Sequence, residues 1–302
     1  MNELQEKILK QKNEKNALIL AHYYQTSEIR EIADVVGDSY EMARRARNAD
    51  QNLLIVCGVL FMAESAKILS PDKTVLFPTL NAGCPMADMI TADGVHKLRN
   101  AHPEAAVMCY VNSSAAVKAV SDVCCTSSSA VAIARALPEK QIIFIPDRNL
   151  GAYVASQIQE KEIILYDGCC PIHDRHTESD LLNVKNRHCK AMVLAHPECR
   201  PEVLRHADYI GSTSGIINTA LKSGEKEFII ATESEISSLL QKSAPEKAFY
   251  PLTNDFICPD MKKTRLSDVL MSLENGTHII SLSDEEANLA RKSLELMVEL
   301  GG

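Results

Sequence analysis

The sequence repeats one pattern three times. Nine short apolar runs have the composition of β-strands and sort into three sets of three. The first run of each set ends at an aromatic residue, namely His22, Tyr110 or His196. A hydroxyl residue follows 17 positions later, at Ser39, Ser127 and Thr213, and a cysteine follows 60 to 62 positions later, at Cys84, Cys170 and Cys258. Agreement of these features in each set predicts three related units.

The units are predicted to be α/β. The apolar runs cover residues 17–22, 53–58, 74–79, 106–112, 141–147, 162–168, 190–196, 228–233 and 248–253. Segments with helical spacing lie between them, at 39–49, 63–69, 128–137 and 218–224. This alternation is typical of parallel sheets covered on both faces. We therefore expect three similar three-layer αβα domains about a pseudo-threefold axis, with the active site at the centre. Their expected limits are 1–90 plus 264–302, 91–176 and 177–263.

Two terminal segments lie outside the repeat and are predicted to be helical. The first residues, MNELQEKILKQKNEK, mix both charges and do not resemble a signal peptide. Near the end of the chain, Ser283 and Glu286 have the spacing of a capping box, and the helix that follows is expected to turn Leu289, Leu294 and Met297 inward.

Composition excludes several classes of protein. With 46% hydrophobic and 24% charged residues in 302, the chain can bury a large core and is not disordered. A formal charge of -8 argues against a nucleic-acid partner. The longest apolar run, 53–63, is far shorter than the roughly 20 residues of a membrane-spanning helix. We expect a cytoplasmic protein with no membrane segment.

The ten cysteines indicate metal chemistry. In a reducing compartment cysteines serve in packing, metal ligation or catalysis. One cysteine from each unit gives three converging thiols, one fewer than a closed zinc or iron–sulfur shell requires. A cubane cluster held by three thiolates would leave one iron open as a Lewis acid. The alternatives are a Cys3His zinc site that includes His173, and packed thiols without a metal, the description that fits Cys57 and Cys109.

The second of these cysteines is ambiguous, because Cys169 adjoins Cys170 and either would suit the spacing. Cys170 is preferred here. It lies 86 and 88 residues from its counterparts and three residues before His173.

Polar residues at the ends of the first strands suggest a catalytic cavity. These residues are His22, Tyr24, Tyr110, Asn112, His196 and Glu198, and they offer proton donors and acceptors. The hydroxyl residues Ser39, Ser127 and Thr213 each precede or open a predicted helix. Such positions cap helices, and three of them at equal spacing also suggest a ligand with several acidic groups.

Nine motifs together resemble the quinolinate synthase family, type A. They are AHYYQ (21–25), GDSYEMA (37–43), NAGCPMA (81–87), CYVNSSAAVKA (109–119), TSSSA (126–130), GCCPIH (168–173), AHPEC (195–199), GSTSG (211–215) and NDFICPDMKKT (254–264). They extend along nearly the whole chain.

The resemblance implies a transferase of NAD biosynthesis with a [4Fe–4S] cluster on Cys84, Cys170 and Cys258. Its substrates would be iminoaspartate and dihydroxyacetone phosphate, with L-aspartate oxidase or aspartate dehydrogenase supplying the iminoaspartate. The substrate-binding residues implied are His22, Ser39, Tyr110, Val111, Asn112, Ser127, His196, Pro197, Glu198 and Thr213. The catalytic residues implied are His22, Tyr24, Tyr110, His173, His196 and Glu198.

One position departs from some members of this family, which carry a CxxC pair near the third ligand. Here the position is Asp255, so a disulfide switch of that kind is not expected. Two other classes remain open from sequence: a cluster-dependent dehydratase acting on another polyacid, and a non-catalytic protein stabilised by a metal.

Overall fold

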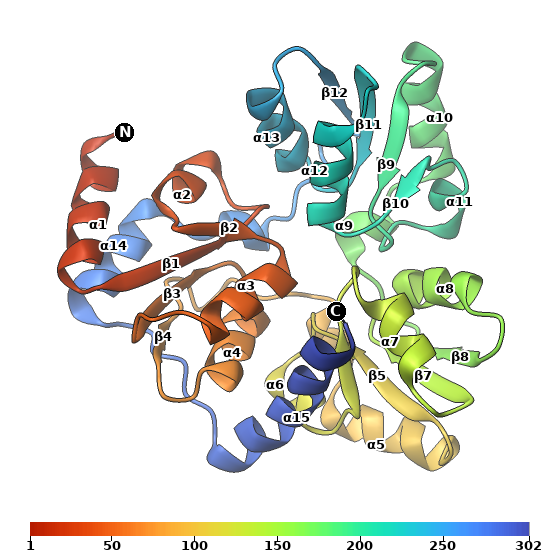
Figure 1. The fold of residues 1–302 in the computed structure, drawn as a ribbon, viewed down its shortest axis with the longest axis horizontal. Helices are drawn as coiled ribbons and strands as arrows, with labels where there is room; N and C mark the ends of the chain where they lie inside the picture. The colour runs from red at the N-terminus through yellow and green to blue at the C-terminus, as the bar shows by residue number, and fades with distance from the viewer. Residues whose placement is uncertain (302) are drawn as a thin grey trace.

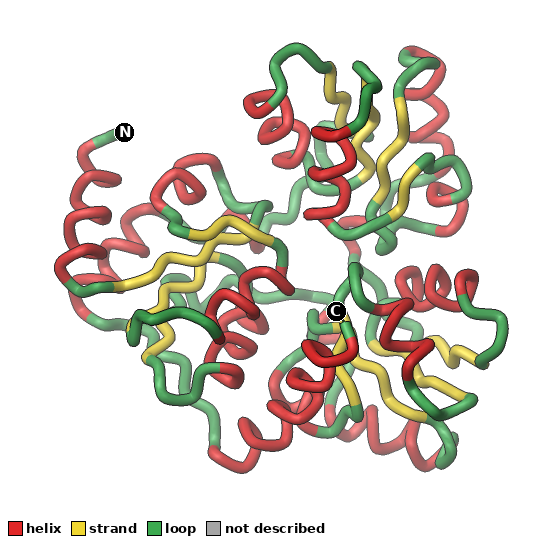
Figure 2. Tube along the Cα trace, viewed as in Figure 1, coloured by secondary structure: helices red, strands yellow, loops and turns green. Residues whose placement is uncertain are grey.

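The computed structural model describes residues 1–301. In that part of the chain the strands form three sheets, each of four parallel strands, and helices flank each sheet (Figures 1 and 2). Figure 1 shows the sheets grouped around a common centre, with the first unit in red and orange, the second in yellow and green, and the third in green-blue and blue. The predicted α/β fold of three similar αβα units is confirmed.

The first sheet has the order β2-β1-β3-β4. Its strands are β1 (Ala17–His22), β2 (Val35–Gly37), β3 (Leu53–Cys57) and β4 (Thr74–Leu76). The helices of this part of the chain are α1 (Glu3–Glu14), α2 (Ser27–Ile32), α3 (Ser39–Arg47), α4 (Leu60–Leu69) and the 3-10 turn η1 (Ala87–Met89).

The second sheet has the equivalent order β6-β5-β7-β8. Its strands are β5 (Ala106–Tyr110), β6 (Val123–Cys125), β7 (Gln141–Ile145) and β8 (Glu162–Leu165). Its helices are α5 (Ala92–Ala101), α6 (Ala115–Ala119), α7 (Ala130–Ala136), α8 (Arg148–Gln157) and α9 (Pro171–Asp174).

The third sheet repeats the order as β10-β9-β11-β12. Its strands are β9 (Met192–Ala195), β10 (Tyr209–Ile210), β11 (Glu227–Ala231) and β12 (Ala248–Pro251). Its helices are α10 (Glu178–Arg187), α11 (Pro201–Leu204), α12 (Thr213–Lys222), α13 (Glu235–Ser243) and the 3-10 turn η2 (Asp260–Lys262). The helices α14 (Leu266–Asn275) and α15 (Asp284–Leu300) complete the chain.

An aspartate fixes the second strand of each unit against the first. The carboxylates of Asp34, Asp122 and Asp208 accept the backbone N–H groups of Ile19, Val107 and Val193, at 2.9, 2.7 and 2.8 Å. The backbone N–H of each aspartate returns a hydrogen bond to the carbonyl of the same strand residue. Because this two-way contact recurs with the same 15-residue separation, the repeat is preserved in hydrogen bonding as well as in sheet order.

The sequence analysis missed one strand in each unit. All nine predicted strands are present, and β2, β6 and β10 are additional. These three strands have only two or three residues, so they contain no apolar run long enough to be recognised. Each runs directly toward a hydroxyl loop, and thereby carries that loop to the carboxyl edge of its sheet.

The terminal helices pack against the first and second units. Helices α1 and α14 pack against each other on the first unit (Figure 1). Helix α15 lies against α6 and β6 of the second unit and also against α4 of the first. Ser293 donates a hydrogen bond to the carbonyl of Lys118 (2.9 Å), and Arg291 donates one to that of Ile68 (3.0 Å). The domain limits expected from sequence stay a prediction.

The inward face of α15 was predicted only in part. Leu294 and Met297 are buried, as expected, whereas Leu289 is 40% exposed. The buried stripe of α15 consists of Ala290, Ser293, Leu294 and Met297, at helical spacing, and Leu289 lies beside this stripe on another face. The expectation for Leu289 is therefore wrong. In residues 1–301 no helix is both long and apolar enough to cross a membrane.

Truncating Leu294 should destabilise the protein. Leu294 is fully buried in the core shared by the first and second units. Leu294→Ala is expected to lower the free energy of unfolding by about 2–5 kcal/mol, because it removes apolar contacts and leaves a cavity. Leu289→Ala, on the same helix, should cost less than about 0.5 kcal/mol. Urea denaturation of the two variants tests this, and equal losses would contradict the packing described for α15.

Candidate active site

A cavity at the centre of the molecule is lined by residues from all three units. It lies beyond the carboxyl ends of the parallel strands, where loops carry functional side chains in α/β folds. The predicted site residues that line it are Cys84, Cys170 and Cys258 with His22, Tyr24, Ser39, Tyr110, Val111, Asn112, Ser127, His173, His196, Glu198 and Thr213. Pro197 is buried and is not among the lining residues, so a contact between Pro197 and substrate stays a prediction.

Each of the three cysteines that line the cavity lies just before a short helical turn. Cys84, Cys170 and Cys258 are each followed by proline, and then by η1, α9 or η2. Burial raises the pKa of the Cys84 thiol to about 12, while the nearby backbone N–H groups of Ala87 and Met86 favour the thiolate. The thiol of Cys258 also contributes to this rise, as Cys84 does for Cys170. Three half-buried sulfurs on one cavity, two of which have their ionisation disfavoured by a neighbouring thiol, are suited to a shared cationic group.

Cys169 and Cys170 have different surroundings. Cys170 lines the cavity, and its backbone N–H donates to Asp147 at 3.0 Å. Cys169 is absent from the lining, and its thiol lies near Asp174 and Arg148 instead. Only Cys170 shares the Cys-Pro dipeptide with Cys84 and Cys258. The dipeptide was a sequence signal that the spacing argument did not use, and it favours Cys170 as the ligand.

Glu198 is the centre of a buried acid–base group. The Tyr110 hydroxyl donates to Glu198 Oε1 at 2.7 Å, and His173 Nδ1 lies 2.9 Å from Glu198 Oε2. Burial acts to raise the pKa of Glu198, but its contacts with His173, His196 and Tyr110 outweigh burial and hold the pKa below its usual value. The carboxylate is therefore ionised at neutral pH. An ionised carboxylate between a phenol and imidazoles can accept a proton.

His22 and His196 occupy equivalent positions and are held alike. The backbone N–H of Tyr24 donates to His22 Nδ1 at 3.1 Å, and that of Glu198 donates to His196 Nδ1 at 3.4 Å. Burial lowers the pKa of each ring to about 4, so both are neutral at pH 7. Because Nδ1 accepts a hydrogen bond in both, the proton is on Nε2. Each ring can thus donate one hydrogen bond to a ligand.

The three predicted hydroxyl residues line the cavity and do not act as side-chain caps. The N-caps of α3 and α12 are Asp38 and Ser212, whose side chains accept backbone N–H groups. Ser39, Ser127 and Thr213 are therefore free for other contacts, and Thr213 lies 3.0 Å from the Tyr24 hydroxyl. In the part of the chain that is described, the buried Oδ1 of Asn112 has no hydrogen-bond partner. An unpaired oxygen in a cavity wall indicates a missing ligand or water.

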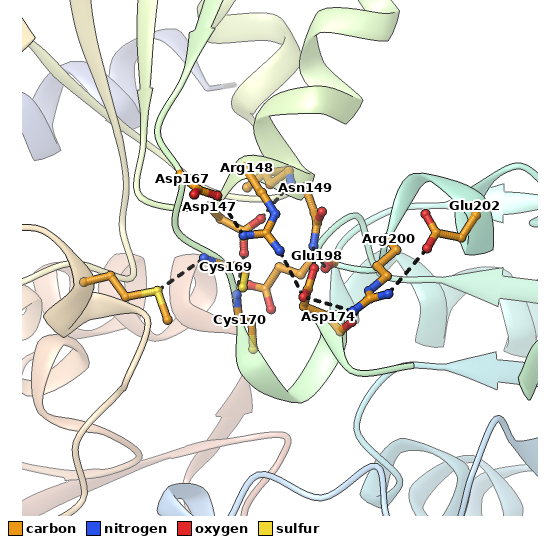
Figure 3. A network of polar contacts seen from close by, with 12 residues as sticks. Asp147, Arg148, Asn149, Asp167, Cys169, Cys170, Asp174, Glu198, Arg200 and Glu202 are labelled. Carbon is orange, nitrogen blue, oxygen red and sulfur yellow. Dashed lines mark hydrogen bonds and ion pairs between the residues drawn. The ribbon is translucent and has the colours of Figure 1, made fainter. Parts of the chain in front are cut away.

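A polar network behind the cavity joins the second and third units (Figure 3). The Asn149 side chain donates to the carbonyl of Glu198 at 3.0 Å and to Asp174 Oδ1 at 2.9 Å. Arg148 and Arg200 both pair with Asp174 Oδ2, at 3.1 and 3.5 Å. These contacts fix the loop that carries Cys170 and His173 against the loop that carries His196 and Glu198.

Removing the Asn149 amide should weaken this junction. Asn149 is 3% exposed, so Asn149→Ala leaves a buried carbonyl and a carboxylate oxygen each without this donor. We expect a loss of about 1–3 kcal/mol in the free energy of unfolding. The matched control is Asn186→Ala at an exposed position of α10, for which the change should stay within about 0.5 kcal/mol. Equal urea midpoints for both variants would contradict this role of Asn149.

Sequence reasoning missed several residues of the cavity wall. One of them, Glu233, follows β11 and is fully buried. The residue before it, Thr232, is also fully buried and contacts two of the lining side chains. Thr232 Oγ1 lies 2.7 Å from the Tyr24 hydroxyl and 3.0 Å from His173 Nε2. Their position at a strand end was a usable signal, because polar residues there face the same edge as His22 and Glu198. The apolar wall, which includes Phe61 and Met62, had no such signal.

The fold and this site define an enzyme class: an α/β protein whose central cavity places thiols and a metal-capable group of cysteine, histidine and glutamate beside proton-transfer groups. A family model described as "Quinolinate synthetase A protein" matches residues 6–299. The chain is 49% identical over 300 residues to a quinolinate synthase of Clostridium perfringens, covering 99% of this chain and 100% of the relative. It is 49% identical to a quinolinate synthase of Caldicellulosiruptor bescii, with coverage of 99% and 98%. It is 48% identical to "Quinolinate synthase 2" of Methanosarcina acetivorans, with coverage of 98% and 96%. The chain belongs to the quinolinate synthetase A family.

Proposed function

We propose that this protein is a quinolinate synthase of de novo NAD biosynthesis. The reaction joins iminoaspartate and dihydroxyacetone phosphate to give quinolinate, phosphate and two waters. The observation that carries this proposal is the convergence of Cys84, Cys170 and Cys258 with the Tyr110–Glu198–His173 group on one cavity, in a chain of this family.

The three cysteines are proposed to hold a [4Fe–4S] cluster. Their chemistry fits one, because the cavity offers three soft sulfur ligands, each with backbone N–H groups nearby that favour the thiolate. When bound through three thiolates, such a cluster supplies one iron without a protein ligand, which acts as a Lewis acid toward a substrate oxygen. The competing Cys3His zinc arrangement would use His173 as the fourth ligand and leave no open position.

The anionic substrates are proposed to bind through neutral donors. Four carboxylates line the cavity, at Asp38, Glu198, Glu233 and Asp260, and within residues 1–301 no lysine or arginine lines it. Substrate carboxylates and phosphate would therefore be held by the Nε2–H groups of His22 and His196, the hydroxyls of Ser39, Ser127 and Thr213, and the amide of Asn112. The N-termini of α3 and α12, next to Ser39 and Thr213, add backbone N–H groups.

Glu198 is proposed as the general base. Condensation and loss of two waters require protons to leave carbon and nitrogen atoms and to reach departing oxygens. Ionised Glu198 can accept a proton, and the Tyr110 hydroxyl that is hydrogen-bonded to it can return one.

Tyr24 is proposed to support the site from one side. Its hydroxyl is hydrogen-bonded to Thr213 and Thr232, and so holds the Thr213 hydroxyl at the cavity. Its ring packs edge-on to His22, with ring centroids 4.6 Å apart.

We also propose a source for the substrate and a cellular compartment for the reaction. Iminoaspartate is unstable in water, so an L-aspartate oxidase or aspartate dehydrogenase is proposed as its source. We place the enzyme in the cytoplasm, where thiols stay reduced.

Product analysis tests the proposed activity. Protein purified without air and supplied with iminoaspartate and dihydroxyacetone phosphate should release quinolinate and phosphate in equal amounts. A dehydratase acting on another polyacid would retain iron and form no quinolinate from this pair. Absence of quinolinate from protein that holds about four irons and four sulfides per chain would overturn the proposal.

A further inference from the structure

Three potential metal ligands lie close together on one side of the cavity. The ligand atoms of Cys170, His173 and Glu198 all lie within 4.8 Å of one another. His173 Nδ1 is 3.3 Å from Cys170 Sγ and 2.9 Å from Glu198 Oε2. Bond lengths of about 2.0–2.3 Å around a tetrahedral zinc ion put neighbouring ligand atoms about 3.4–3.6 Å apart. To accept such an ion, the spacing from His173 to Cys170 has to open by about 0.1–0.3 Å, and that from His173 to Glu198 by about 0.5–0.7 Å.

A hydrogen bond from a neighbouring residue also orients each of these three residues. His173 Nε2 lies 3.0 Å from Thr232 Oγ1. This hydroxyl can accept a hydrogen bond from Nε2–H, so that on metal binding the Nδ1 lone pair faces the other two ligands. Glu198 Oε1 accepts from Tyr110, which leaves Oε2 available. The backbone N–H of Cys170 donates to Asp147 Oδ2. Metal-binding histidines and carboxylates typically have supporting contacts of this kind.

We propose that the chain without its cluster binds one divalent transition-metal ion, such as zinc, through Cys170, His173 and Glu198. Binding releases the Cys170 thiol proton to solvent, and the thiolate and carboxylate then neutralise the two charges of the buried ion. The fourth position faces the cavity and takes water, as in zinc sites with three protein ligands. This set differs from a Cys3His site because it excludes Cys84 and Cys258.

The ion and the cluster exclude each other. Both use Cys170, and the ion draws His173 and Glu198 toward that sulfur. A chain loaded with zinc therefore has to lose the metal before a cluster can assemble. This last step rests on the proposed cluster ligands, whereas the metal site itself rests only on the geometry of Cys170, His173 and Glu198.

Cobalt titration of the full chain, prepared without air and without cluster, tests the site. Cobalt should bind at one ion per chain with sulfur-to-cobalt charge-transfer absorption, and zinc should displace it. Cys170→Ser should abolish the charge-transfer band, and His173→Gln should lower affinity by at least about 100-fold. The matched control is His176→Gln, since His176 packs on the same Phe256 ring as His173 and should leave cobalt binding unchanged.

Two further variants separate this site from a three-cysteine site. Cys84→Ser and Cys258→Ser should retain the cobalt spectrum of the unaltered chain although they remove proposed cluster ligands. Loss of the spectrum in either variant, or its survival in His173→Gln, would overturn the proposal, as would the absence of any cobalt–sulfur band in the unaltered chain.

Cluster assembly tests the exclusion. One equivalent of zinc, added before iron and sulfide, should lower the cluster yield, and a chelator should restore it. In His173→Gln the same zinc should have little effect. Equal yields with and without zinc in the unaltered chain would contradict the exclusion. Neither experiment measures turnover, so failure of the proposed reaction would leave its outcome unchanged.

Discussion

Replacing any one of Cys84, Cys170 and Cys258 by serine should remove most of the bound iron and lower turnover by about a thousandfold or more. With two thiolates a cubane cluster has half its ordinary ligands and is expected to be lost on purification. Loss of a Lewis acid that stabilises the transition state by about 4 kcal/mol corresponds to a thousandfold in rate. Iron and sulfide analysis together with quinolinate formation would measure the two effects in the same samples.

The adjacent cysteine provides the control. Cys169→Ser changes the same functional group one residue from Cys170, at a side chain that does not line the cavity. Cys189→Ser does so at an exposed position. Both variants should retain iron and activity. If Cys169→Ser loses iron while Cys170→Ser keeps it, the second ligand has been assigned to the wrong residue.

Glu198→Gln should separate catalysis from binding. Glutamine has nearly the same shape and can still accept the Tyr110 hydrogen bond, but it cannot take a proton at neutral pH. Turnover is expected to fall by about 10²- to 10⁴-fold, the usual contribution of a general base. The dissociation constant of quinolinate should change by less than about tenfold. Single-turnover kinetics and product titration would measure the two quantities.

A nearby carboxylate serves as the comparison for Glu198. Glu202 lies four residues further along, outside the cavity lining, and is 3.7 Å from Arg200 (Figure 3). Glu202→Gln should leave turnover nearly unchanged. If Glu198→Gln weakens product binding as much as it slows turnover, then Glu198 contributes to binding in general and has no specific catalytic role.

The predictable part of this fold was the repeat. Strands such as β1, β5 and β11 are long, apolar and buried, so each can be recognised in the sequence as a run of apolar residues. The strands β2, β6 and β10 are set by the hydrogen bonds of Asp34, Asp122 and Asp208 to the neighbouring strand. Those contacts join residues 15 positions apart, and local periodicity does not reveal them. The exposure of Leu289 likewise depends on which face of α15 packs against the core, and that face carries Ala290 and Leu294.

The candidate site was predictable where it follows the repeat. Equal spacing predicted that the three cysteines and the three hydroxyl residues belong to one site, and all six line the cavity. The link from Asn149 to Glu198 crosses between units and has no counterpart in spacing. The contact of His173 with both Cys170 and Glu198 depends in the same way on how two loops meet. Such contacts depend on tertiary packing, so they required coordinates.

The most direct test of the proposed centre is a crystal of the protein grown without air, with anomalous diffraction recorded at the iron edge. We predict one compact iron peak within bonding distance of the sulfurs of Cys84, Cys170 and Cys258, with one iron facing the cavity and bound to no side chain. Iron bound through Cys169, or a fourth protein ligand closing the centre, would contradict the account.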